Sequence, residues 1–246
     1  LPPVPATISM QVEAMMEQLR AFDTPFQKAL FLDGLRSSNE TLYFRLLLEH
    51  IEEVLPLVYT PTVGEVCQKF SHLFRFAKGL YLSIEDKGHV SEILENLPQE
   101  AVDMIVVTDG QRILGLGDLG INGMGIPVGK LALYTACAGV DPRRTLPVIL
   151  DVGTNTERYL NDPLYLGHKH PRVSGQEYDD FIEEFFQSVY KKWPKCVVQF
   201  EDFGNNHAFD LLARYRSRYC CYNDDIQGTA SIVVSGFFSA MRAKKS

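Results

Sequence analysis

The sequence predicts an α/β fold, with a mainly helical N-terminal region over residues 1–100 and a mainly parallel β-sheet with flanking helices over residues 101–246. Apolar residues of the first region recur at three- and four-residue steps, which is typical of helices that bury one face. In the second region, short apolar runs at 145–152, 196–200 and 219–222 alternate with segments of helical character. Such alternation favours a parallel sheet covered by helices.

The N-terminal region is expected to contain several helices. A helical stretch over 7–35 is interrupted near Pro25. Ser37 and Glu40 are spaced as a capping box, which predicts that a helix follows. Pro56 is expected to end or kink that helix just before Tyr59, because proline cannot donate the next backbone hydrogen bond. Further helices are expected at 63–73 and 91–97.

In the second region, Asp109-Gly110 lies between apolar runs at 104–108 and 112–115, which is a β-hairpin signal. A helix is expected from Val128 to Ala138, after a glycine-rich loop. Three further helices are expected at 177–192, 208–217 and 226–243.

Composition excludes several classes of protein. The 246 residues are 46% hydrophobic and 22% charged, which fits a globular chain and excludes a disordered or fibrous one. A net charge of −7 without a Lys/Arg block argues against nucleic-acid binding, and the lack of a long uncharged apolar run argues against a membrane span.

The five cysteines form no CxxC pattern, which favours a reducing, intracellular compartment. Cys220-Cys221 is expected to fill a buried strand. The chain begins with Leu1 and not with Met, as expected of a processed or trimmed product.

Two acidic pairs follow predicted strands. Glu201-Asp202 comes directly after the run 196–200, and Asp224-Asp225 comes after the run 219–222 and just before a helix. Because the carboxyl ends of parallel strands meet at one edge of a sheet, these carboxylates can converge. Carboxylates that converge repel one another, and a hard cation such as Mg²⁺ or Mn²⁺ relieves that repulsion. The alternative is solvated helix-capping acids, and both readings stay open here.

The segment 115–120 fits the pattern G-x-G-x-x-G, but its context argues against a dinucleotide loop. A predicted hairpin precedes it, and Gly123, Gly125 and Pro127 delay the helix that would hold a pyrophosphate. A tight glycine-rich substrate loop is the favoured interpretation.

Three further side chains are candidates for chemistry. Arg112 presents a planar guanidinium that suits a carboxylate. Lys130 lies at the start of an apolar helix, where burial is expected to lower its pKa toward that of a general base. A surface ion pair is the alternative for each. Tyr59 precedes a proline turn, where it can donate a proton or pack into the core.

Taken together, five motifs resemble those of the malic enzyme family. They lie in order at 58–64, 115–120, 125–130, 200–203 and 223–230, and the likeness runs from about residue 1 to 242. This family oxidatively decarboxylates L-malate to pyruvate and CO₂, with NAD or NADP and a divalent metal. The resemblance implies that L-malate and pyruvate are the ligands of this chain and that the chain forms a homodimer or homotetramer. It implies no nucleic-acid or membrane partner, and a location in the cytoplasm or an organelle matrix such as that of mitochondria.

The resemblance also assigns roles to residues already singled out. Glu201, Asp202 and Asp225 are expected to ligate Mg²⁺ or Mn²⁺, with Asp224 beside them as a catalytic residue. Lys130 resembles the base that takes the C2 hydroxyl proton while hydride leaves for the nicotinamide.

Three other roles follow from the same resemblance. Tyr59 is similar to the acid that protonates C3 of enolpyruvate. Arg112 is expected to hold a malate carboxylate, and Arg112 and Thr229 are expected to contact the dinucleotide.

Two departures from the family qualify this expectation. The family continues into a C-terminal Rossmann domain that is absent from this chain, so NAD versus NADP preference is not readable. A non-catalytic module that binds metal and dicarboxylate, or only assembles with partners, is therefore the alternative. Ser38 stands where fumarate-activated members carry arginine, which argues against such activation.

Overall fold

A computed structural model describes residues 7–245 and confirms the predicted α/β architecture. Five parallel strands form one sheet in the order β1-β3-β2-β4-β5. The strands are β1 Leu80–Ser83, β2 Met104–Thr108, β3 Thr145–Asp151, β4 Val197–Phe200 and β5 Cys221–Asn223. β2 is the central strand, and its Met104 aligns with Thr145 of β3 on one side and with Val197 of β4 on the other.

Helices cover both faces of the sheet. One face packs against α7 (Val90–Glu95), α10 (Gln176–Lys192) and α11 (Asn205–Tyr215), and Val198 and Phe200 of β4 belong to that core. The opposite face packs against α5 (Thr62–Gln68) and α8 (Gly125–Ala138). Because side chains alternate along a strand, Gln199 of β4 points toward the α8 face.

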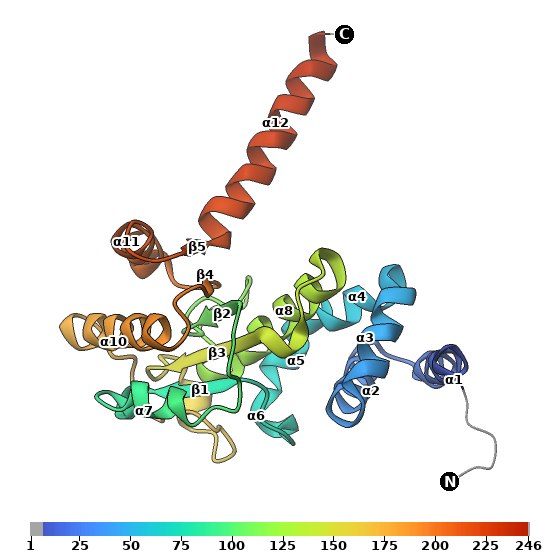
Figure 1. Cartoon of the computed structure of the whole chain (residues 1–246), viewed down its shortest axis with the longest axis horizontal. Helices are drawn as coiled ribbons and strands as arrows, with labels where there is room; N and C mark the ends of the chain where they lie inside the picture. Colours follow the sequence, from blue (N-terminus) through green and yellow to red (C-terminus); the bar gives the residue numbers. More distant parts are fainter. Residues whose placement is uncertain (1–6, 246) are drawn as a thin grey trace.

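The N-terminal helices form a second core beside the sheet (Figure 1). They are α1 Ile8–Arg20, α2 Pro25–Ser38, α3 Glu40–Glu49 and α4 Ile51–Val58, followed by α5 and by α6 Phe70–Leu73. Ala132 of α8 belongs to this second core, so α8 contacts both the sheet and the N-terminal helices. The edge strand β1 precedes residue 100 in the chain, and the predicted domain boundary there stays a prediction.

Helix caps agree in part with the sequence analysis. The break near Pro25 is confirmed, and Thr24 and Gln27 form a capping box there. The predicted capping box at Ser37 and Glu40 is wrong, because α2 continues through Ser38 and the Ser37 hydroxyl donates to the carbonyl of Asp33. Asn39 caps α3 instead, since its side chain accepts from the amide of Leu42.

The helix that contains Pro56 ends at Val58, as predicted, but His50 separates α3 from α4. The helix predicted at 63–73 is divided at Lys69 into α5 and α6, and the one predicted at 226–243 begins as a π-helical turn. The other predicted helices are confirmed with shifted ends, and a short helix α9 (Glu157–Leu160) was not expected.

The predicted hairpin at Asp109-Gly110 is wrong. Both edges of β2 are already paired with β3 and β4, so no edge is left for an antiparallel partner. The chain does turn at Gly110, whose φ of 72° favours glycine, and it then forms a loop up to a 3₁₀ segment at Gly120–Met124. This loop carries the glycine motif 115–120.

Beyond β5, a π-helical turn at Asp224–Gly228 leads into α12 (Thr229–Lys245), which projects away from the sheet (Figure 1). The predicted burial of Cys220 is wrong, because the edge strand begins only at Cys221 and Cys220 is exposed. Among the described residues, no helix combines the length and apolar character needed to cross a membrane.

Candidate functional site

The acidic pairs that follow β4 and β5 meet beside α8, as the sequence predicts for neighbouring parallel strands. Glu201 comes directly after β4, and Asp224 comes directly after β5. The ammonium Nζ of Lys130 lies 3.0 Å from Oε1 of Glu201 and 2.7 Å from Oδ2 of Asp224. Three of the predicted site residues therefore form one ion-pair cluster.

Tyr59 joins this cluster from the end of α4. Its hydroxyl donates to Oε1 of Glu201 at 3.0 Å, and Nζ of Lys130 lies 5.2 Å from the centre of its ring. A glycine allows this close approach. A Cβ on Gly129 would lie 2.8 Å from the carbonyl oxygen of Val58 and 2.9 Å from the Tyr59 ring. The packing of α8 against the end of α4 thus sets the position of the tyrosine.

The pKa of Lys130 is shifted in the direction opposite to the one expected from the sequence. Burial alone would lower its pKa, but the carboxylates of Glu201 and Asp224 outweigh burial and raise the pKa above its ordinary value. The predicted lowering is therefore wrong for this arrangement, in which Lys130 is a cation between two carboxylates. Burial and the neighbouring Glu201 also raise the pKa of Tyr59, which keeps its proton.

Asp202 adopts a strained conformation and is held by the loop that follows β2. Its φ of 56° is unusual for a residue with a side chain. Its carbonyl accepts from the amide of Arg112 at 3.1 Å, and its Oδ2 accepts from the amide of Leu114 at 3.1 Å. Its own amide donates to Oδ2 of Asp225 at 2.8 Å. Burial, Asp225 and Glu201 raise the pKa of Asp202 to about 8.

The alternative of solvated capping acids does not fit the first pair. Glu201 and Asp202 are 3% and 7% exposed, and α11 begins only at Asn205. It fits the second pair better, since Asn223 caps the turn in which Asp224 and Asp225 lie. The first pair therefore consists of two carboxyl groups buried in the interior, where a charged form is stable only beside a partner of opposite charge or a hydrogen-bond donor.

The predicted metal ligands are close to one another but are not arranged around an ion. Within residues 7–245, no group of three or more His, Cys, Asp or Glu side chains is arranged to hold a metal as it stands. Oε1 of Glu201 pairs with Lys130, while Asp202 and Asp225 are linked through a backbone amide. The donors are all carboxylate oxygens, which suit Mg²⁺ or Mn²⁺, and burial together with their mutual repulsion raises the pKa of Asp202.

Arg112 and Thr229 lie at the edge of the cluster. Arg112 is exposed, and its guanidinium makes no ion pair with any residue in the described part of the chain. It is therefore free to bind an anion. Thr229 is the exposed first residue of α12, and its amide donates to the carbonyl of Asp224.

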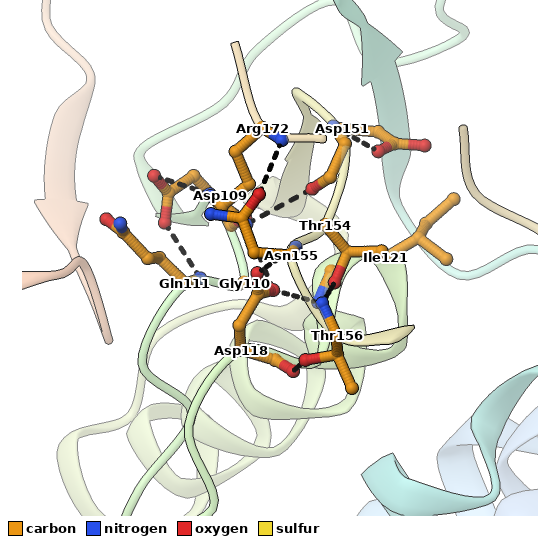
Figure 2. Close-up of polar contacts among 12 residues, drawn as sticks. Asp109, Gly110, Gln111, Asp118, Ile121, Asp151, Thr154, Asn155, Thr156 and Arg172 are labelled. Atoms are coloured by element: carbon orange, nitrogen blue, oxygen red, sulfur yellow. Dashed lines mark hydrogen bonds and ion pairs between the residues drawn. The ribbon is translucent and has the colours of Figure 1, made fainter. Parts of the chain in front are cut away.

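A buried network holds the loop that carries Arg112, and Figure 2 shows its contacts. The guanidinium of Arg172 lies 2.9 Å from Oδ2 of Asp109 and 3.2 Å from Oδ1 of Asp118. It also donates to the carbonyls of Asp109 and Gly153. Oδ2 of Asp109 accepts a further hydrogen bond from the hydroxyl of Tyr178. We call Arg172, Asp109 and Asp118 the loop clamp.

The sequence gives no signal for the loop clamp, because Asp109 fits a hairpin turn and Asp118 fits a glycine motif. Gln199, whose side-chain amide donates to Oε2 of Glu201, is also absent from the residues that the sequence predicts for the site. The available signal for Gln199 was a single polar residue inside an apolar strand.

Comparison with known proteins places these observations in a family. The sequence profile described as "Malic enzyme, N-terminal domain" matches residues 36–216. The chain is 51% identical over 243 residues to "NAD-dependent malic enzyme 2" of Photobacterium profundum, covering 99% of this chain and 44% of that protein. It is 53% identical over 243 residues to "NADP-dependent malic enzyme" of Dictyostelium discoideum, covering 99% of this chain and 45% of that protein.

A solved malic enzyme from Entamoeba histolytica aligns with 99% of this chain and 41% of its own, with a TM-score of 0.46 at 20% identity. The chain therefore spans less than half the length of each of these three proteins.

Proposed function

The chain belongs to the malic enzyme family, and from this premise we propose that it supplies the metal- and malate-binding part of an oxidative decarboxylase. The reaction converts L-malate to pyruvate and CO₂ and reduces NAD⁺ or NADP⁺. The observation that carries the proposal is the hydrogen-bonded cluster of Tyr59, Lys130, Glu201 and Asp224 at the ends of β4 and β5. It joins a proton donor, an ammonium group and carboxylates at the sheet edge where ligands of such folds bind.

The metal would be held by Glu201, Asp202 and Asp225, whose carboxylates repel one another without it. Such a cation polarises the C2 oxygen of malate and stabilises negative charge on it during decarboxylation. The relatives' names specify no metal, and this assignment rests on the chemistry of the donor set.

Lys130 would accept the proton of the C2 hydroxyl as hydride leaves for the nicotinamide. Lys130 can act as a base only if its pKa falls, which requires that another partner neutralise the carboxylates that raise it. Glu201 is both its partner and a proposed metal ligand, so the two roles are coupled through one carboxylate. Asp224, which contacts Nζ at 2.7 Å, would then orient the free amine.

Tyr59 would protonate C3 after CO₂ departs, since it keeps its proton and contacts Glu201 inside the cluster. Arg112 would bind a carboxylate of malate through its unpaired guanidinium. Arg112 and Thr229 would also contact the dinucleotide. One relative is named for NAD and another for NADP, and we assign neither preference to this chain.

The second candidate is a module that binds metal and dicarboxylate without turnover, or that only assembles with partners. The observation that favours it is the share of the relatives' length that the chain covers, 44% and 45%. Assembly as a homodimer or homotetramer and an intracellular location are part of the proposal, and sedimentation of the purified chain tests the first.

One experiment separates the two candidates. The purified chain is titrated with Mn²⁺ by calorimetry, and turnover of malate with NAD⁺ or NADP⁺ is followed by nicotinamide absorbance. Turnover supports the enzyme and excludes the module, and Lys130→Ala then abolishes turnover while Mn²⁺ affinity stays nearly intact. Binding of Mn²⁺ and oxalate without turnover supports the module. A chain that takes up no Mn²⁺ contradicts the metal ligands in both cases.

A further inference from the structure

Gln199 is a polar side chain in a strand that is otherwise apolar, and it is fully buried. Its Nε2 donates to Oε2 of Glu201 at 2.5 Å. Its Oε1 accepts from the hydroxyls of Tyr134 and Tyr222, each at 2.6 Å. A buried amide without such partners would be costly, and here both its oxygen and its nitrogen are used.

These three residues form a layer directly beneath the candidate site. Gln199 lies two residues before Glu201 and contacts it, and Tyr222 lies two residues before Asp224, which begins the turn after β5. Gln199 and Tyr222 are also aligned across β4 and β5. Tyr134 follows Lys130 by four residues on α8, which places both on one face of the helix. β4, β5 and α8, which position Glu201, Asp224 and Lys130, thus also supply this layer.

The charge of Glu201 fixes the direction of every hydrogen bond in the layer. An ionised carboxylate only accepts, so the group of Gln199 that faces it is the amide nitrogen. The amide oxygen then faces the two tyrosines, and both hydroxyls donate to it. No proton is left for the 3.2 Å contact between the hydroxyls of Tyr134 and Tyr222. Rotation of the amide by half a turn would place its oxygen against the Glu201 carboxylate and break that bond, and it would require both hydroxyls to accept instead of donate.

The two oxygens of Glu201 consequently have different tasks. Oε2 is held by Gln199, and Oε1 is left to contact Lys130 and the hydroxyl of Tyr59, each at 3.0 Å. We propose that Gln199 is a positioning residue that fixes the Glu201 carboxylate for the ligand and proton chemistry of the site, and that Tyr134 and Tyr222 jointly hold Gln199 in that orientation. This inference rests on the proposed function and adds three residues to it.

The first test measures Mn²⁺ affinity of the purified chain by calorimetry. Gln199→Leu risks misfolding, so the tyrosines are changed instead. Tyr134→Phe and Tyr222→Phe together leave the amide oxygen unpaired and are expected to weaken Mn²⁺ binding about tenfold, the scale seen when a partner that orients a metal ligand is lost. Each single change leaves one donor in place, so the double change is expected to exceed the sum of the singles on a logarithmic scale.

Tyr190→Phe is the matched control. Its hydroxyl donates to the carbonyl of Cys220 at 2.6 Å, and it has no contact with Gln199. It therefore removes a comparable hydrogen bond and is expected to leave Mn²⁺ affinity unchanged. If the control weakens Mn²⁺ binding as much as the double change, or if the double change has no effect, the positioning role is wrong.

A second readout does not depend on the metal. In ¹⁵N NMR spectra without metal, the side-chain amide protons of Gln199 are expected to be shifted and slow to exchange, and the double change is expected to abolish both properties. If the unmodified chain takes up no Mn²⁺, the proposed metal site fails and this NMR result alone decides the inference. Fast exchange of the Gln199 amide protons in the unmodified chain would overturn the inference even where Mn²⁺ binds.

Discussion

Two clusters of charge lie at the carboxyl edge of the sheet, one largely buried and one partly exposed, and they differ in how their charges are balanced. In the loop clamp, the guanidinium of Arg172 contacts both carboxylates, and backbone amides or the Tyr178 hydroxyl bind the remaining carboxylate oxygens. In the candidate site, one ammonium group, that of Lys130, faces four carboxylates. Only Glu201 and Asp224 of these pair with it.

The two clusters therefore differ in role: the charges of the loop clamp stabilise the fold, whereas the unpaired carboxylates of the candidate site suit a cationic ligand. A buried charge with every oxygen bonded is stable as it stands, and it fixes the three loops that meet at Arg172. Burial and neighbouring carboxylates raise the pKa of Asp202, and the surrounding packing keeps these carboxyl groups together. We call Asp202 and Asp225, which do not pair with Lys130, the excess acids. We therefore expect substitutions in the loop clamp to lower stability and substitutions of the excess acids to weaken Mn²⁺ binding.

The largest expected effect is in the loop clamp. Arg172→Leu leaves the fully buried carboxylate of Asp109 without its cation, and such losses cost about 3–5 kcal/mol in the free energy of unfolding. Arg172→Lys is expected to cost less but still to destabilise, because one ammonium group cannot reach the four acceptors that the guanidinium binds. Urea denaturation measures both.

Arg20→Leu is the control for this prediction. Arg20 also forms a close ion pair, with Glu53, but that pair is exposed to solvent, so its loss is expected to leave stability nearly unchanged. If Arg172→Leu were no more harmful than Arg20→Leu, the clamp would not hold the loops, and the comparison between the two clusters would fail.

A smaller effect on stability is expected where α8 packs closely against the end of α4. Gly129→Ala places a methyl group 2.8 Å from the carbonyl oxygen of Val58 and against the Tyr59 ring, and overpacking of this kind costs about 1–3 kcal/mol. Gly34→Ala is the matched control, since Gly34 lies inside α2 with no atom within 4 Å of the added methyl group. It is expected to stabilise the chain by about 0.5–1 kcal/mol through helix propensity. Thermal unfolding of the pair shows whether close approach, and not helix propensity, governs Gly129.

The sequence predicted the acids of the site because the governing rule is local. Glu201 and Asp224 each follow a short apolar run, and neighbouring parallel strands bring such positions together whatever the rest of the chain does. The helices were predicted for the same reason, since their apolar spacing and caps lie within the helix itself. Errors there are mostly at helix ends and breaks, as where Asn39 caps α3 in place of Ser37 and where His50 separates α3 from α4.

The failures depend on contacts between residues far apart in the chain. The hairpin at Asp109-Gly110 fails because β3 and β4 occupy both edges of β2, which no local pattern reveals. Arg172 and Asp109 are 63 residues apart, so their pairing could not be read from spacing. The pKa of Lys130 was predicted from burial alone, and its direction is reversed by two carboxylates that only the fold brings near.

The smallest expected change in stability concerns an excess acid, and its sign is opposite to that of the clamp. Asp225→Asn keeps an oxygen that can accept from the amide of Asp202 but removes a charge that repels Glu201 and Asp202. Without metal, the chain is expected to gain about 0.5 kcal/mol, a small gain because solvent screens this exposed side chain. Mn²⁺ affinity is expected to fall at least about tenfold, since a proposed ligand is lost.

Asp23→Asn, which removes an exposed charge far from the site, is the control and should change neither stability nor Mn²⁺ affinity. Denaturation in the presence of a chelator and Mn²⁺ calorimetry on the same samples check the two quantities together. If Asp225→Asn lowered stability, this carboxylate would hold the fold as those of the clamp do. Repulsion between Asp225 and the buried acids Glu201 and Asp202 would then be too weak to favour binding of a cation there.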